Sequence, residues 1–180
     1  MSAYVMLFFH ESYGLVEWQF GLIAAGCAFM FVLASALADA LEKAVGAPTA
    51  FLSGFSISAT GFFLLGDGFS LPFWCAMGAY YVLFLGIAFA SILGPPTLLK
   101  TAQAADFKLE DASVQSATLT IFMTGAAQAI APPAGGMIAD RFGAASANTY
   151  GGAAILAIGL TQAVLLKAFS RKTHPSASMV

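Results

Sequence analysis

The chain has 180 residues, of which 59% are apolar and only 9% are charged, and its formal net charge is −2. Soluble globular proteins carry about 25% charged residues, so this composition excludes a water-soluble enzyme, and the abundance of apolar residues excludes a disordered chain. Seven basic residues against nine acidic ones leave no basic surface for nucleic acid. We therefore expect an integral protein of the lipid bilayer.

Long stretches without charged residues or histidine predict the membrane-spanning helices, each of which needs about 20 mainly apolar residues. The N-terminal stretch Met1–Phe9 is apolar but too short to cross, and we interpret it as the end of a span. Five longer stretches predict full spans at residues 18–38, 46–66, 71–94, 114–138 and 145–167. The expected fold is an all-α, polytopic bundle of five full helices and one partial helix. It forms one domain over residues 1–169, followed by a disordered cytoplasmic tail at 170–180.

The basic residues of the connecting segments predict the orientation of the chain. Lys and Arg accumulate on the cytoplasmic side of membrane proteins, and six of the seven basic residues fall on the side that also holds the C-terminus. Only Arg141 falls on the other side. We predict an outer N-terminus and a cytoplasmic C-terminus in the cell membrane. The longest connection, Lys100–Asp111, is rich in charge and predicts a short amphipathic helix at the cytoplasmic surface.

The ends of the first and fourth full spans share an Ala-Asp dipeptide, at Asp39 and at Asp140. The two aspartates are three spans apart, so the two helix ends should lie on opposite faces of the membrane. Inverted repeats of three helices each, which many transporters contain, have this arrangement. A chance match of two dipeptides is the alternative.

Four segments carry a resemblance to the major facilitator superfamily of transporters, and together they extend over most of the chain. Ser35–Lys43 resembles a degraded copy of that family's loop motif, Gly-x-Leu-Ala-Asp-Arg-x-Gly-Arg-Arg/Lys. Gly136–Gly143 matches this motif better, and Ala131–Gly136 is similar to the antiporter motif Gly-Pro-x-x-Gly-Gly. Glu11–Gly21 resembles the loop that enters the second or eighth helix of drug antiporters.

Two further features indicate which half of such a transporter the chain resembles. The arginine in the fourth helix of the amino-terminal half has no counterpart in residues 71–93, whereas Gly86–Pro96 is similar to helix ten of Bcr/CflA-type drug-resistance antiporters. The resemblance implies the carboxyl-terminal half, from the end of helix seven to helix twelve. It implies a transporter, or a truncated half of one, that moves small molecules such as drugs by alternating access. A second chain carrying the other helices is then an expected partner.

The loop motif implies residues that close the gate between the two halves. They are Asp39, Lys43, Gly136, Asp140, Arg141 and Gly143. The alternative interpretation of the charges is that they simply end an apolar run at the membrane surface, and the missing arginines around Asp39 leave both interpretations open.

Two proline pairs and their glycines predict changes of helix direction, because proline lacks a backbone donor and clashes with the preceding turn. The predicted kinks are at Gly94, Pro95, Pro96, Pro132, Pro133 and Gly135. The first pair is equally consistent with the end of a helix, whereas small and apolar residues continue after the second pair and favour a kink.

Small residues four positions apart predict close helix packing. They occur as Gly21/Ala25, Ala24/Ala28 and Gly86/Ala90/Gly94. Polar and aromatic side chains within spans are the candidates for lining a substrate cavity: Tyr80, Tyr81, Thr120, Thr124 and Gln128. The last three recur every four residues and share one helix face, which suits either a cavity wall or hydrogen bonds between helices.

No ionisable residue lies within the middle of a span, where such residues mark proton or ion paths. Cys27 and Cys75 lie in apolar runs, and His10 and His174 are isolated, so we expect no metal site and no cofactor. Without a catalytic constellation the chain is not expected to be an enzyme. The alternative to a transporter is a non-transporting membrane subunit or assembly factor.

Overall fold

The computed structural model describes residues 2–104 and 109–173, although not every side chain among them. Six helices follow one another in this part: α1 (Ser2–Tyr13), α2 (Glu17–Val45), α3 (Ala47–Leu64), α4 (Phe73–Ala104), α5 (Leu109–Phe142) and α6 (Ala144–Thr173). No strand occurs in either described range. The all-α prediction is confirmed, and each predicted segment corresponds to one helix, with α1 in place of the partial span.

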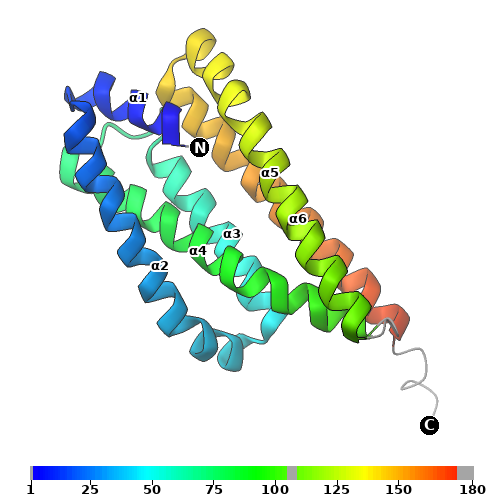
Figure 1. Cartoon of the computed structure of the whole chain (residues 1–180). Helices are drawn as coiled ribbons and strands as arrows, with labels where there is room; N and C mark the ends of the chain where they lie inside the picture. The colour runs from blue at the N-terminus through cyan, green and yellow to red at the C-terminus, as the bar shows by residue number, and fades with distance from the viewer. Residues whose placement is uncertain (1, 105–108, 174–180) are drawn as a thin grey trace.

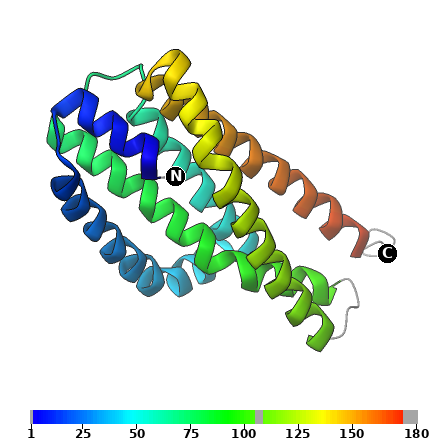
Figure 2. The same cartoon turned by 45° about the horizontal axis from the view of Figure 1, so that its top comes forward.

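The helices α2 to α6 run back and forth, and α1 lies across one end of the bundle (Figure 1). That end also holds the α1–α2, α3–α4 and α5–α6 connections, and we call it the tryptophan end because Trp18 and Trp74 lie in the first turns of α2 and α4 there. The α2–α3 connection and the C-terminal ends of α4 and α6 lie at the opposite end, as Figure 2 also shows. We call this the lysine end, after Lys43 and Lys100.

Three helices in the described part are long and apolar enough to cross a membrane, over Glu17–Val45, Ala47–Leu64 and Phe73–Lys100. The prediction of five full spans is therefore confirmed only for these three. The helices α5 and α6 are also long, but they are rich in Ala, Gly, Ser and Thr.

Two groups of buried side chains form the core. The first lies toward the tryptophan end, where Phe9, Phe62 and Tyr80 are almost fully buried. The second lies between α2, α3 and α4 toward the lysine end, around Ala50 and Phe89. Large apolar side chains on the outer face of α2 are exposed, which is the arrangement expected of a helix that faces lipid.

The helices α3 and α4 touch through their backbones. A Cβ atom on Gly86 would collide with the backbone nitrogen of Ser58 and lie 2.6 Å from the oxygen of Gly54. A Cβ on Gly54 would lie 2.7 Å from the backbone nitrogen of Ala90. This glycine seam confirms close packing at Gly86 and Ala90, because in a bilayer small residues let helices approach and gain dispersion contacts.

The predicted packing stripe at Gly21 and Ala25 of α2 does not serve packing within this chain. Both residues are exposed, and a Cβ atom on Gly21 would meet nothing within 4 Å. In the second predicted stripe of α2, Ala24 packs against the core but Ala28 is exposed. Small residues at helical spacing therefore do not show by themselves which face of a helix packs.

Both proline pairs lie inside helices, Pro95–Pro96 in α4 and Pro132–Pro133 in α5. The alternative that α4 ends at the first pair is therefore wrong. The Thr97 hydroxyl donates a hydrogen bond of 2.7 Å to the Leu93 oxygen across this irregular turn, so it adds a local polar contact where the prolines remove two backbone donors.

The predicted amphipathic helix at Lys100–Asp111 is not a separate element. The helix α4 continues to Ala104 and α5 begins at Leu109, while residues 105–108 lie outside the described part. At the other terminus α6 continues to Thr173, so the first residues of the predicted tail are helical; residues 174–180 lie outside the described part.

Candidate functional site

Two single-residue glycine corners connect equivalent helices. Gly46 joins α2 to α3 with φ of 82°, and Gly143 joins α5 to α6 with φ of 88°. The amide of Gly46 donates to the Glu42 oxygen at 2.8 Å, and that of Gly143 donates to the Ala139 oxygen at 2.8 Å. Positive φ values are unfavourable for residues with a Cβ atom, so glycine is required at both corners.

The two corners lie at opposite ends of the bundle (Figure 1). Gly46 is at the lysine end and Gly143 is at the tryptophan end. Three helices, α3, α4 and α5, separate the two corners along the chain. The ends of α2 and α5, with Asp39 and Asp140, are therefore separated as the sequence predicts. One corner therefore lies among the first three helices, α1–α3, and the other among the last three, α4–α6.

The predicted charged gate residues are exposed and form no ion pair with one another among the described residues. Asp39 and Lys43 are exposed on α2, and Asp140 and Arg141 are exposed at the end of α5. Among the described residues none of these four forms an ion pair. A Cβ atom on Gly136 would meet nothing within 4 Å, so this glycine is not needed for packing within the chain.

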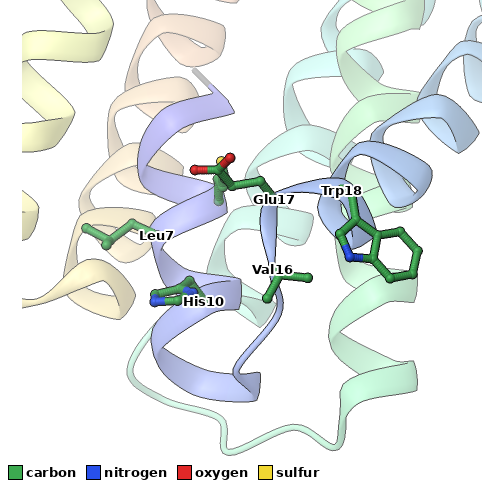
Figure 3. A pocket seen from close by; sticks show the side chains of 6 residues that line it. Leu7, His10, Val16, Glu17 and Trp18 are labelled. Carbon is green, nitrogen blue, oxygen red and sulfur yellow. The ribbon is translucent and has the colours of Figure 1, made fainter.

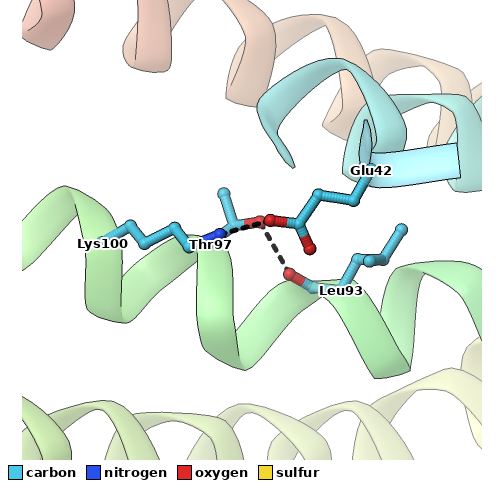
Figure 4. Close-up of polar contacts among 4 residues, drawn as sticks. All are labelled: Glu42, Leu93, Thr97 and Lys100. Carbon is cyan, nitrogen blue, oxygen red and sulfur yellow. Dashed lines mark hydrogen bonds and ion pairs between the residues drawn. The ribbon is translucent and has the colours of Figure 1, made fainter. Parts of the chain in front are cut away.

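An ion pair that the sequence analysis missed joins α2 to α4 at the lysine end. The Lys100 ammonium donates to the Glu42 carboxylate, and the Glu42 side chain is 26% exposed (Figure 4). Glu42 follows Asp39 by less than one helical turn, so the ion pair lies in the region that the motif indicated but involves a different carboxylate. The C-terminal ends of α2 and α4 lie at the same end of the bundle. A Glu near one of these ends and a Lys near the other could therefore have been predicted to pair.

A second polar contact ties the α3–α4 turn to α6 at the tryptophan end. The Ser146 hydroxyl donates to the Asp67 carboxylate, and the Asp67 amide donates to the Thr149 hydroxyl at 3.2 Å. The fully buried Asn148 donates from Nδ2 to the Leu65 oxygen at 3.0 Å. We call these residues the outer clasp. The sequence analysis did not predict these contacts, although the polar residues at the start of α6 could have suggested a partner for Asp67.

The predicted cavity residues are placed as follows. Tyr80 is 1% exposed and packs against the rings of Phe9 and Phe20, with both centroid separations at 5.7 Å. Tyr81 is half-buried beside Gly26 of α2. The remaining candidates, whose side chains lie outside the described part, are Thr120, Thr124 and Gln128.

A groove of about 620 Å³ lies between α1 and the start of α2 (Figure 3). Its lining residues are Met6, Leu7, His10, Val16, Glu17 and Trp18. The sequence analysis did not predict this groove, because it depends on how α1 folds back against α2 and not on a local motif.

No protein family model, curated protein or solved structure matches this chain. The resemblance to the major facilitator superfamily therefore depends on the sequence motifs alone.

Proposed function

We propose that the chain forms one six-helix unit of a transporter of the major facilitator type, which moves small molecules across the cell membrane together with a second unit. The observation that carries the proposal is the pair of glycine corners, Gly46 and Gly143. They close equivalent helices of two successive three-helix units at opposite ends of the bundle, and inverted three-helix repeats are the building plan of such transporters.

In this proposal α2 to α6 cross the membrane and the lysine end faces the cytoplasm. Support comes from Trp18 and Trp74, which are 67% and 72% exposed at the opposite end. Tryptophan is enriched at membrane–water interfaces, and lysine is enriched on the cytoplasmic side. The C-terminus is then cytoplasmic, and the connections at the tryptophan end are outside.

Alternating access requires contacts at each end that can open in turn. The Glu42–Lys100 ion pair at the lysine end and the outer clasp around Asp67 are polar contacts between different helices at the two ends. The exposed charges of Asp39 and Arg141 are available to a second unit at opposite faces. These side chains support the motif-based assignment of gating without forming a complete gate within one chain.

The second unit is required for chemical reasons as well. A transporter driven by protons or ions needs an ionisable group within the membrane, and no Asp, Glu, Lys, Arg or His lies in the middle of a predicted span of this chain. The proposed role of this unit is to form one wall of the substrate path and to move against its partner. The coupling group then belongs to the partner.

Stabilisation by substrate tests the proposal. The chain, purified in mild detergent together with its bound partner, should unfold at a higher temperature when an amphipathic small molecule is present. A compound at a hundredfold excess over its Kd adds about 2.7 kcal/mol of stability, which is about 5 °C or more for a chain of this size. Sugars of similar size serve as the control panel. A partner complex of fixed composition whose Tm no compound changes would instead identify a non-transporting subunit or assembly factor.

A further inference from the structure

The groove between α1 and α2 combines apolar walls with two polar groups at the tryptophan end. Met6, Leu7 and Val16 provide the apolar surface, and His10 and Glu17 provide the polar atoms. Figure 3 shows the Glu17 carboxylate lying over α1, from which Leu7 and His10 project. Trp18 lines the same groove and is exposed. Because tryptophan is enriched at membrane–water interfaces, the groove is expected to lie at the membrane surface.

The hydrogen bond of His10 determines what this side chain offers to a ligand. Its Nδ1 atom lies 2.9 Å from the carbonyl oxygen of Leu15. A carbonyl oxygen can only accept, so Nδ1 carries the hydrogen atom. In the neutral imidazole the other nitrogen, Nε2, then has a free lone pair and acts as an acceptor.

Glu17 offers a second acceptor. It is exposed in the first turn of α2, where the helix dipole favours a negative charge. No hydrogen bond or ion pair engages its carboxylate among the side chains that the structure describes. Among the described residues that line the groove there is no lysine or arginine. The polar part of the groove therefore presents two acceptors and a negative charge, without a donor from a basic side chain.

We propose that this groove binds a membrane phospholipid whose headgroup ends in a primary ammonium, of the phosphatidylethanolamine class. A primary ammonium has three N–H donors, and the carboxylate of Glu17 and Nε2 of His10 are each acceptors for such a donor. A quaternary ammonium has no such donor. Charge complementarity selects the headgroup, and the apolar walls accept the adjoining part of the lipid. The inference depends on insertion into a membrane and is independent of transport.

Competitive lipid binding tests the inference. Native mass spectrometry of the full chain in detergent, with equal amounts of dioleoyl phosphatidylethanolamine and dioleoyl phosphatidylcholine, should show a roughly tenfold preference for the ethanolamine lipid. Glu17→Gln should reduce this preference to less than about twofold, because a charge-assisted hydrogen bond is lost. Glu11→Gln is the matched control, since Glu11 is an exposed carboxylate of α1 that does not line the groove. This control should keep the preference of the unmodified chain.

The N-methylated lipids provide a graded readout that does not depend on a variant. Binding should fall as the mono-, di- and trimethylated headgroups lose N–H donors in turn. Equal binding across this series, or an unchanged preference in Glu17→Gln, would overturn the proposal. Binding of soluble phosphoethanolamine as strong as that of the intact lipid would also overturn it, because the apolar walls would then have no part.

Discussion

Gly86→Ala should lower the free energy of unfolding by about 2 kcal/mol, a typical cost of forcing an extra carbon into a packed interface. The added Cβ would meet the backbone of Ser58 and lie 2.6 Å from the oxygen of Gly54. Backbone atoms cannot rotate away as the tip of a side chain can, so α3 and α4 would have to separate. Denaturant unfolding in detergent micelles, followed by circular dichroism, measures the change.

Gly78→Ala is the matched control on the same helix. A Cβ atom at Gly78 would meet nothing within 4 Å, and alanine is a better helix former than glycine by roughly 1 kcal/mol. This variant should therefore keep or slightly increase stability. A loss of similar size in both variants, or no loss in Gly86→Ala, would contradict the glycine seam.

Tyr80→Ala should destabilise the protein by about 3 kcal/mol or more, the usual range for removing a large buried aromatic ring. The ring contacts Phe9 of α1, Phe20 of α2 and Phe84 of α4, the last with a centroid separation of 4.8 Å. Its removal would leave a void where three helices meet. The same unfolding experiment measures this effect.

Tyr80→Phe separates the role of the ring from that of the hydroxyl. It keeps every ring contact, and we expect its stability to remain within about 1 kcal/mol of the unmodified chain, the size of one ordinary hydrogen bond. If Tyr80→Ala unfolded as readily as Tyr80→Phe, the ring would not be a core element. Tyr80 would then return as a candidate for lining a cavity.

The helices could be predicted from the sequence because the bilayer sets a minimum apolar length. The predicted span at 18–38 and the observed α2, Glu17–Val45, show both the strength and the limit of this argument. The charged residue Asp39 ends the apolar run but does not end the helix, because hydrogen bonding along the backbone continues to Gly46. For the same reason α4 extends past Lys100.

The candidate site could be predicted only where it depends on local sequence. The dipeptides at Asp39 and Asp140 indicated the two corners, since a helix end and its glycine lie close together in the chain. The Glu42–Lys100 pair, the outer clasp of Asn148 and the His10–Glu17 groove depend on how distant helices are rotated against one another. Hydrophobicity and spacing do not determine that rotation, because most of these helices are apolar on nearly every face and the sequence does not mark which face packs.

The central claim, that the chain consists of two inverted three-helix units in a membrane, is tested most directly by labelling the two helix ends. Lys43→Cys and Arg141→Cys, each in a background with Cys27→Ala and Cys75→Ala, place one thiol at an exposed position at each end. A membrane-impermeant maleimide should label Lys43→Cys only in inside-out vesicles and Arg141→Cys only in right-side-out vesicles. Labelling of both thiols from the same side would contradict the inverted arrangement and the transporter proposal that depends on it.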